Sequence, residues 1–343
     1  MRGLFFDGPG EIRVASDLPE PVIEDPTDVI VDVTLSGLCG SDLHPFEDRE
    51  PCAPGVIPGH EAVGVVSATG SEVSTVAPGD RVIVPFTVSC GHCRQCASGL
   101  SSRCRSSRLF GWGDPSGVPP PLHGGQAERL RVPLADGTVV PIPDGVDDPT
   151  ALLLTDNFPT ALHAVTRTDW TEGPMAIIGL GAVGLCAVAA ARAVGVTDIL
   201  AIDPVASRRE AAESLGARTA TPEDASGEFP AVVEAAGPLS AQRLAAQLAA
   251  VGATISIIAV QTAEAFGIDP VAAYDKNLSI STGRAPVRSV LDRILPELAG
   301  FRIPTETVIT HPDRPLKEGP DLYRTFSARD DGLIKATFRP SEE

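Results

Sequence analysis

The sequence predicts a two-domain α/β protein, with a β-rich domain at residues 1–150 and 285–343 and a doubly wound parallel-sheet domain at residues 151–284. The chain of 343 residues is long enough for two hydrophobic cores at about 150 residues each. Short β-branched runs separated by turn signals fill its first part. From about residue 151, apolar runs alternate with the alanine- and leucine-rich periodicity of helices, which favours a parallel sheet.

The first part has the short strands of an all-β module. Residues 29–33 and 62–66 are β-branched runs, and the Pro-Gly-Asp sequence at 78–80 is one of the turn signals between such runs. Residues 106–125, rich in glycine and proline, form the longest stretch without a predicted element. Long ordered loops of this kind often border sites.

The middle of the chain has four apolar runs with helical patterns between them, at residues 175–178, 198–202, 231–234 and 253–258. Strand and helix in alternation predict parallel strands with helices on both faces of the sheet. After residue 285, a helical pattern at 287–298 and short segments ending at 333–338 close the chain and complete the first domain.

The charge balance excludes some partners. With 27 basic and 45 acidic residues the net charge is −18, so the chain would repel a nucleic-acid backbone. No run approaches the roughly 18 apolar residues of a membrane helix, and Asp7 comes too early for a secretory signal. We therefore expect a cytoplasmic protein without a nucleic-acid or membrane partner. In that reducing compartment, clustered thiols bind metal more often than they form disulfides.

Four of the seven cysteines lie in one predicted lobe, residues 88–106, and they are Cys90, Cys93, Cys96 and Cys104. Three follow the CxxC spacing that wraps a tetrahedral ion, and four thiolates complete the shell of a structural zinc. An iron–sulfur cluster and a pair of disulfides are alternatives, and His92 is an alternative fourth ligand. A closed four-thiolate site has no open position, so its predicted role is to stabilise the lobe. Cys52 and Cys186 are predicted to be unligated.

Two further segments place potential ligands next to glycines. One is Cys39-Gly-Ser-Asp-Leu-His44, and the other is Gly59-His60-Glu61. Neither segment is conclusive alone. Together they fit a catalytic zinc, because such a site takes about three protein ligands from mixed side chains and keeps one exchangeable position.

A glycine-rich fingerprint follows the run at 175–178 and opens a helical pattern that extends to about Val194. Its residues are Gly179, Gly181, Ala182, Val183 and Gly184. In this context the pattern predicts a Rossmann dinucleotide site with the pyrophosphate at the helix N-terminus. Asp203, at the end of the next apolar run, can accept hydrogen bonds from ribose hydroxyls, so NAD is favoured over NADP. Arg208 and Arg209 follow closely, either as solvated helix residues or as partners for a 2′-phosphate.

These motifs, in this order and over essentially the whole chain, resemble the zinc-dependent medium-chain dehydrogenases, of which the alcohol dehydrogenases are the type members. The resemblance implies a GroES-like β-rich catalytic domain and a Rossmann domain, with the active site in the cleft between them. It also implies a homodimer or a homotetramer.

The resemblance implies a catalytic-zinc role for the second set of potential ligands. Cys39 and His60 match metal ligands of the family, and Glu61 matches an adjacent carboxylate that can exchange onto the metal. Asp42 matches the acceptor that orients the imidazole of His60. Asp156 stands where alcohol dehydrogenases have a cysteine and polyol dehydrogenases have a glutamate, so it is the remaining expected ligand.

Some segments resemble one branch of the family. The Pro-Thr pair at 159–160, shortly after Asp156, is similar to the glutathione-independent formaldehyde dehydrogenases, and so is the Gly-Gly-Gln-Ala-Glu segment at 124–128. Ala161 departs from that branch, which usually has glycine there. We therefore do not transfer the substrate of that branch to this chain.

Three further residues have roles by resemblance. Ser41 matches the hydroxyl that passes the alcohol proton toward water, and His44 matches the histidine that continues this relay. Outside the motif they would be a turn serine and a surface histidine. Lys335 matches a basic residue that often contacts the pyrophosphate, and an exposed strand lysine is the equally weighted alternative.

The leading prediction is an oxidoreductase that transfers a hydride between an alcohol and NAD, with two Zn²⁺ ions per chain, one catalytic and one structural. A polyol, sugar or amino-alcohol dehydrogenase is the alternative within the enzyme class. A non-catalytic nucleotide-binding relative and a nucleic-acid-binding zinc module are alternatives from other classes. The full set of potential ligands argues against the former, and the negative charge argues against the latter.

Overall fold

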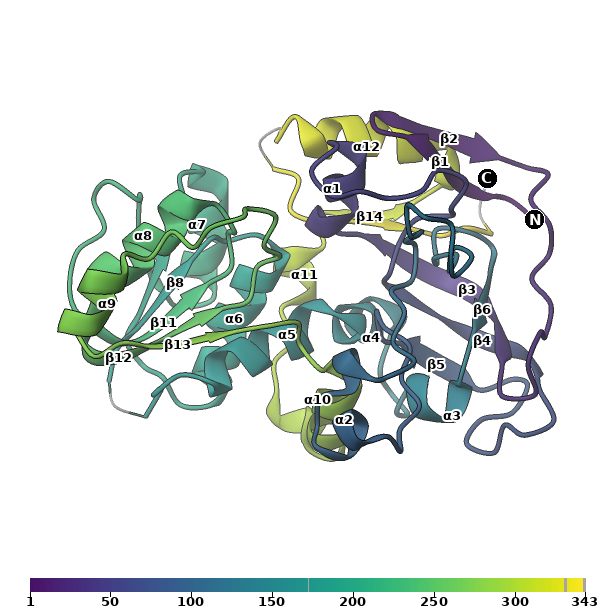
Figure 1. Ribbon diagram of the computed structural model, residues 1–343, viewed down its shortest axis with the longest axis horizontal. Helices are drawn as coiled ribbons and strands as arrows, with labels where there is room; N and C mark the ends of the chain where they lie inside the picture. The colour runs from purple at the N-terminus through teal and green to yellow at the C-terminus, as the bar shows by residue number, and fades with distance from the viewer. Residues whose placement is uncertain (172, 330–331, 342–343) are drawn as a thin grey trace. The chain divides into compact units, whose positions relative to one another are not determined.

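A computed structural model describes residues 1–171, 173–329 and 332–341 (Figure 1). The chain divides into two compact units, of which the first comprises Met1–Asp156, Pro286–Pro296 and Ile309–Glu343 and the second comprises Asn157–Ala285 and Glu297–Val308. Residues 151–156 are predicted in the parallel-sheet domain and residues 297–308 in the β-rich domain, whereas their contacts group each segment with the other unit. The helices and strands confirm the predicted α/β class with a β-rich part and a parallel-sheet part.

The first unit is built on a seven-stranded sheet. Its path runs β14 (His311–Arg314), β15 (Ala336–Phe338), β3 (Val29–Leu38), β4 (Ala62–Thr69), β5 (Arg81–Val84) and β7 (Val140–Pro141), with β6 (Arg129–Val132) also on β3. All these pairs are antiparallel except β14 with β15. A separate hairpin joins β1 (Gly3–Gly8) to β2 (Glu11–Ala15). Valines of β3, β4 and β5 fill one core of this unit.

Short helices connect these strands. They are η1 (Gly40–Asp42), α1 (Leu43–Phe46), α2 (Arg94–Ala97), η2 (Ser101–Arg103), α3 (Ala135–Thr138), α4 (Asp148–Thr155), α10 (Val287–Ile294), η4 (Leu316–Glu318) and α12 (Gly319–Ser327). Asp147 is the N-cap of α4, where its side chain accepts the N–H of Thr150 at 3.0 Å, and Asp156 is the C-cap. The helix predicted at 287–298 is shorter in the structure. It ends at Ile294 as α10, and the 3₁₀ segment η3 (Leu295–Gly300) follows.

Strand order brings three potential site segments to one end of the sheet. β15 and β4 flank β3, with Ala336 opposite Leu38 and Ser36 opposite Ala62. Cys39 follows the last residue of β3, and Glu61 precedes the first residue of β4. Residues that are far apart in sequence therefore meet at this end of the sheet.

The second unit contains a six-stranded parallel sheet with helices on both faces (Figure 1). Its order is β10 (Arg218–Ala220), β9 (Ile199–Ile202), β8 (Met175–Ile178), β11 (Phe229–Glu234), β12 (Ala249–Ile257) and β13 (Ser279–Thr282). Its helices are α5 (Asn157–Thr166), α6 (Ala182–Ala193), α7 (Ala206–Ser214), α8 (Leu239–Leu248), α9 (Pro270–Asp275) and α11 (Thr305–Val308). The strand order reverses between β8 and β11, where open α/β sheets bind ligands.

Two further predictions can be compared with the structure. Residues 106–125 contain no helix or strand, only isolated bridges such as Trp112 to Leu122. Among the described residues, no helix combines the length and the apolar character that crossing a membrane requires.

Candidate functional site

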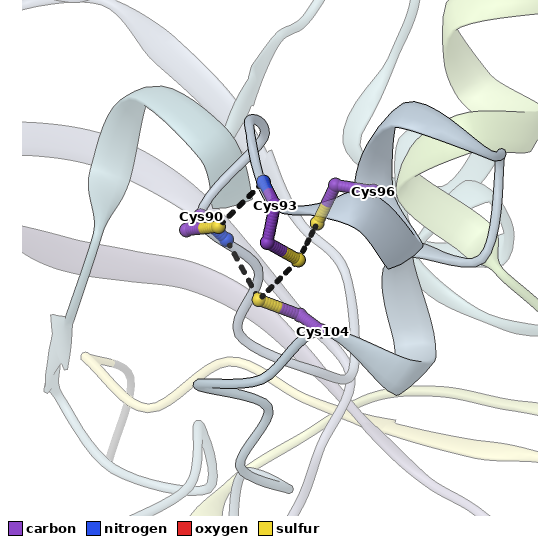
Figure 2. Close-up of side chains that lie close together, drawn as sticks. All are labelled: Cys90, Cys93, Cys96 and Cys104. Carbon is purple, nitrogen blue, oxygen red and sulfur yellow. Dashed lines mark hydrogen bonds between the residues drawn. The ribbon is translucent and has the colours of Figure 1, made fainter.

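The four cysteines of the predicted lobe face one another (Figure 2). Cys93 Sγ lies 3.6 Å from Cys96 Sγ and 3.8 Å from Cys104 Sγ. A tetrahedral zinc with Zn–S bonds of about 2.3 Å separates its sulfurs by roughly 3.8 Å. The donor set therefore fits a closed four-thiolate zinc site. All seven cysteines lie in the described part of the chain, and none of them is in a disulfide.

Backbone N–H groups point at the sulfurs of this lobe. The Cys93 N–H donates to Cys90 Sγ at 3.3 Å, and the N–H groups of Cys90 and Ser106 donate to Cys104 Sγ at 3.3 and 3.4 Å. Backbone donors at Cys96 and Arg105 lower the pKa of Cys93 to about 6. Such donors stabilise thiolates, which are the form that binds metal. His92 instead lies with Nδ1 2.8 Å from the Cys90 carbonyl and is exposed.

The second set of predicted ligands also converges. Cys39, His60, Glu61 and Asp156 each have a ligand atom within 4.8 Å of the others. Asp156 Oδ2 lies 3.8 Å from Cys39 Sγ and 3.6 Å from His60 Nε2. Zinc bonds of about 2.0–2.3 Å give ligand separations of roughly 3.3–3.8 Å, so these three atoms fit one zinc shell. Residues 39, 60, 61 and 156 are called the mixed-ligand cluster below.

Asp42 fixes the orientation of the His60 ring. Its Oδ1 lies 2.9 Å from His60 Nδ1, and its Oδ2 accepts the Cys39 N–H at 2.9 Å. With Nδ1 on the carboxylate, Nε2 faces Cys39 and Asp156. Burial alone would lower the pKa of His60, but Asp42 and Asp156 raise it well above its usual value.

The charged groups of the mixed-ligand cluster are suited to bind a metal cation. Burial raises the pKa of the Cys39 thiol, and the Glu61 carboxylate raises it further. His60, Glu61 and Asp156 are buried, and Cys39 is half-buried. A nearby cation or hydrogen-bond donors stabilise the ionised form of a buried acid, and binding of a metal displaces the protons of its ligands. Sulfur, nitrogen and oxygen donors together suit zinc.

Glu61 has a partner that the sequence analysis did not assign to it. The ammonium of Lys335 forms an ion pair with Glu61 Oε2, and both residues have an exposed fraction of 0%. Burial opposes the ammonium form, but Glu61 and Cys39 raise the net pKa of Lys335. Gly37 on β3 leaves room for this carboxylate, because a Cβ at residue 37 would overlap Glu61 Oε2. Lys335 is therefore not an exposed strand lysine.

Ser41 and His44 differ in how they relate to the mixed-ligand cluster. Ser41 Oγ lies 3.3 Å from Cys39 Sγ and 3.4 Å from His60 Nε2, so it is at the cluster. His44 is in α1 and only 9% exposed, with Nδ1 3.6 Å from Glu50 Oε2. His44 is thus a buried histidine beside a carboxylate and not a surface residue.

The glycine fingerprint forms a strand–turn–helix in the second unit. Gly179 follows β8 with φ +88°, and a Cβ there would meet the backbone of Ala236. A Cβ at Gly184 would overlap the Gly179 carbonyl oxygen, so α6 packs closely on the turn. Gly181, the N-cap of α6, has open space beside its Cα, since an added Cβ would meet nothing within 4 Å. Ala182 and Val183 begin α6, whose free N–H groups suit a pyrophosphate.

Asp203 lies just beyond β9, next to this turn. It is 4% exposed and accepts the N–H groups of Leu180 at 2.8 Å and Val205 at 2.9 Å. Arg208 Nη1 is 3.9 Å from Asp203 Oδ2, whereas Arg209 donates to the carbonyls of residues 203 and 204. The Asp203 carboxylate therefore lies beside the Arg208 guanidinium, while Arg209 holds the backbone of the loop at residues 203–204.

Two buried polar residues behind the mixed-ligand cluster were missed from sequence. Gln126 donates to Asp42 Oδ2 at 3.4 Å and accepts from the Tyr323 hydroxyl at 2.9 Å. The only local signal is the Gly-Gly-Gln segment at 124–126, which indicates a family resemblance but no contact with Asp42. Nothing near Tyr323 in the sequence indicates its partner, 197 positions away.

Comparisons with known proteins agree with this geometry. Residues 25–144 match the alcohol dehydrogenase GroES-like domain. The probable zinc-binding alcohol dehydrogenase of Mycobacterium tuberculosis is 35% identical over 351 residues, covering 99% of this chain and 89% of that protein. Zinc-type alcohol dehydrogenase B of Aspergillus flavus is 39% identical and covers 86% of this chain and 72% of that protein.

Solved structures and one more relative extend the likeness. An alcohol dehydrogenase of Thermus sp. ATN1 superposes with a TM-score of 0.90 at 31% identity, covering 99% of both chains. A glutathione-independent formaldehyde dehydrogenase of Pseudomonas aeruginosa is 35% identical over 234 residues, which are 63% of this chain and 57% of that protein. The resemblance noted from the motifs is thereby confirmed.

Proposed function

Because the chain belongs to the zinc-type alcohol dehydrogenases of the medium-chain dehydrogenase family, we propose that it transfers a hydride between an alcohol and NAD, with one catalytic and one structural zinc per chain. The observation that carries the proposal is the convergence of Cys39 Sγ, His60 Nε2 and Asp156 Oδ2 with Asp42 behind the imidazole. When bound, zinc supplies a Lewis acid for the substrate oxygen, and NAD supplies the hydride acceptor.

In this proposal Cys39, His60 and Asp156 hold the catalytic zinc. Asp42 holds the His60 tautomer by accepting its Nδ1–H, a role that metal-binding histidines usually require of a neighbour. Glu61 is paired with Lys335 and lies next to the ligands, so it is the carboxylate available for exchange. The lobe of Cys90, Cys93, Cys96 and Cys104 holds the structural zinc.

The alcohol proton leaves through this chain's own hydroxyl and imidazole groups. Ser41 Oγ is the hydroxyl at the mixed-ligand cluster, within 3.4 Å of two ligand atoms, and it takes the proton first. His44 is the next group in the proposed relay, and its Nδ1 lies 3.6 Å from Glu50 Oε2.

For the dinucleotide, the turn at Gly179–Gly184 binds the pyrophosphate at the N-terminus of α6. Asp203 binds the ribose hydroxyls, and its charge disfavours a 2′-phosphate, which supports NAD over NADP. Arg208, 3.9 Å from Asp203, partly offsets that charge. A steady-state assay with both dinucleotides tests the preference, and a large preference for NADP would contradict the role of Asp203.

We also propose a homodimer or homotetramer and a cytoplasmic location. β13 is at the edge of the parallel sheet, and an edge strand can pair with its counterpart in a second copy. Among the described residues, six large apolar side chains between 251 and 280 are exposed, namely Val251, Val260, Phe266, Val271, Tyr274 and Ile280. A reducing compartment would keep the four-thiolate lobe unbridged.

Zinc analysis tests the proposal. We expect two zinc ions per wild-type chain, and about one in Cys39→Ala, because that variant lacks a ligand of the catalytic zinc only. Cys39→Ala should abolish NAD reduction while its circular dichroism spectrum stays unchanged. Cys52→Ala is the matched control and should keep both zinc ions, since Cys52 lies in neither ligand group. Full activity in Cys39→Ala would exclude a catalytic zinc at this position.

A screen of NAD reduction across primary, secondary, polyol and sugar alcohols tests the substrate class. Turnover of one of these classes separates a simple alcohol dehydrogenase from a polyol or sugar dehydrogenase. A zinc-loaded protein that binds NAD but reduces it with none of them would favour the non-catalytic alternative.

A further inference from the structure

A row of buried polar groups continues from Asp42 into the interior of the first unit. The Tyr323 hydroxyl donates to Gln126 Oε1 at 2.9 Å. Gln126 Nε2 donates to the Gly37 carbonyl at 3.0 Å and to Asp42 Oδ2 at 3.4 Å. Asp42 Oδ1 in turn lies 2.9 Å from His60 Nδ1. Four side chains therefore connect the middle of α12 to a ligand atom of the mixed-ligand cluster.

The direction of these hydrogen bonds follows from the chemistry of the groups. The Gly37 carbonyl and the Asp42 carboxylate only accept, so the Gln126 amide turns its NH₂ group toward them. Its oxygen then faces Tyr323, whose hydroxyl has to donate. Burial raises the pKa of Tyr323 well above its usual value, and Asp42 raises it further, so the hydroxyl keeps its proton. The row has one consistent orientation that ends on the Asp42 carboxylate.

Packing alone does not require an amide at position 126 or a hydroxyl at position 323. Gln126 and Tyr323 both have an exposed fraction of 0%, and Tyr323 packs on Phe46 with ring centroids 5.4 Å apart. Replacing both partners of a buried hydrogen bond with apolar groups of similar shape is often nearly neutral for stability. A fully satisfied buried polar network instead fixes the conformation of its members. The member with a chemical task is Asp42.

We propose that Gln126 and Tyr323 are positioning residues of the metal site, which hold the Asp42 carboxylate so that His60 presents Nε2 to the metal. Gln126 acts directly on Asp42 Oδ2, and Tyr323 acts through Gln126. The inference rests on the proposed function, in which His60 binds the catalytic zinc. Loss of this support leaves the Cys39 N–H as the remaining donor to Asp42 Oδ2. The carboxylate is then held less firmly, and His60 binds the metal more weakly.

The test measures zinc release from the fully zinc-loaded protein into a chromogenic chelator. Cys39→Ala, which lacks the catalytic zinc, identifies which of the two release phases belongs to the mixed-ligand cluster. Gln126→Met keeps the side-chain length but removes both donors, and we expect its catalytic zinc to leave about tenfold faster. Tyr323→Phe removes one hydroxyl, and we expect release about threefold faster. The double variant should match Gln126→Met alone, because Tyr323 acts through Gln126.

A second buried glutamine provides the matched control. Gln242 on α8 has an exposed fraction of 0%, donates to Gln261 and accepts the Gly267 N–H at 2.7 Å. Gln242→Met loses the same kinds of hydrogen bond in the second unit, and we expect unchanged release of both zinc ions. The release phase of the four-cysteine lobe should also stay unchanged in Gln126→Met, which shows that the first unit is still folded.

Three outcomes would overturn the inference. Equal release rates in wild type and Gln126→Met, with two zinc ions in each, would overturn it while the proposed function stands. Faster release of both zinc ions together in Gln126→Met would reveal a general loss of structure and also overturn it. A wild-type chain that holds zinc only at the four-cysteine lobe would overturn the proposed function and this inference with it.

Discussion

The ion pair of Lys335 and Glu61 is the feature in which a single side chain has the largest expected effect. Both charges are fully enclosed, and the two residues are 274 positions apart in the sequence. An ion pair of this kind adds little stability as a pair, but removal of one partner leaves the other buried without its counter-charge. The effect of a substitution at Lys335 is therefore an effect on Glu61.

Lys335→Met should lower the free energy of unfolding by about 3 kcal/mol, because Glu61 remains as a buried carboxylate without its ammonium. Urea unfolding of the zinc-loaded protein measures this change. Lys317→Met is the matched control at an exposed lysine and should leave stability unchanged.

Combining Lys335→Met with Glu61→Gln should restore most of the lost stability, because no uncompensated charge remains. A single-variant loss below about 1 kcal/mol would mean that the other surroundings of Glu61 compensate its charge.

Single residues also show which contacts can be predicted from sequence and which cannot. The convergence of Cys90, Cys93 and Cys96 was predictable, since their spacing along the chain brings their sulfurs together. Lys335 was predicted for the pyrophosphate or an exposed strand, and the ion pair with Glu61 was missed. Its burial depends on a carboxylate brought close by strand pairing, and no local pattern encodes that contact.

At the scale of single elements, the turn between β8 and α6 contains glycines with two different functions, close packing at Gly184 and space for the pyrophosphate at Gly181. Gly184→Ala should lower the melting temperature by several degrees, as expected for overpacking of about 2 kcal/mol, because its Cβ would overlap the Gly179 carbonyl oxygen. Gly181→Ala should keep the melting temperature, since its Cβ enters open space, yet weaken NADH binding by blocking the pyrophosphate.

Thermal unfolding and NADH fluorescence titration distinguish the two variants. Each variant is the control for the other, since they lie three residues apart in the same turn. Unchanged NADH affinity in Gly181→Ala would place the pyrophosphate elsewhere.

Another element with a specific pH dependence is α3, which holds the loop at residues 74–75. The Asp136 carboxylate accepts the N–H of Ser74 at 3.0 Å and the hydroxyl of Thr75 at 2.8 Å. Partial burial would raise the pKa of Asp136, but the donors of Ser74 and Thr75 lower it to about 2.

Because this pKa is lowered in the folded state, Asp136 contributes stability above its unfolded pKa near 3.8 and loses it as pH falls through about 2. Asp136→Asn should cost about 1 kcal/mol at pH 7, a value reduced for solvent exposure, and the difference from wild type should shrink toward pH 2. Urea unfolding across pH 2–7 measures this. A difference that is constant with pH would show that the charge of Asp136 is not the cause.

For the whole molecule, the edge strand β13 bears on assembly. We expect the wild-type chain to be a dimer or tetramer by light scattering with size exclusion, and Ile280→Lys to dissociate it, because a charge on an edge strand opposes pairing. Val118→Lys, at an apolar side chain that is 76% exposed in the first unit, is the control and should leave the assembly intact. A monomeric wild type would contradict the proposed assembly.

At this scale the sequence predicted the class of both units and some of the strands of each sheet. Periodicity and turn signals are local, and the predicted runs at 175–178 and 231–234 lie in β8 and β11. The assignment of residues 297–308 differed, because the contacts that place this segment with the second unit are made after folding and leave no periodic pattern. The Asp42–Gln126–Tyr323 row was missed for the same reason.

The absence of a Cβ at Gly37 restricts how the sequence of this protein can evolve. A methyl group there would push the Glu61 carboxylate out of its place beside Lys335. A relative that acquires alanine at position 37 must therefore change position 61 or 335 as well. In an alignment of many relatives, these three positions should covary as a unit, and an alanine at 37 beside an unchanged acid–lysine pair should be rare.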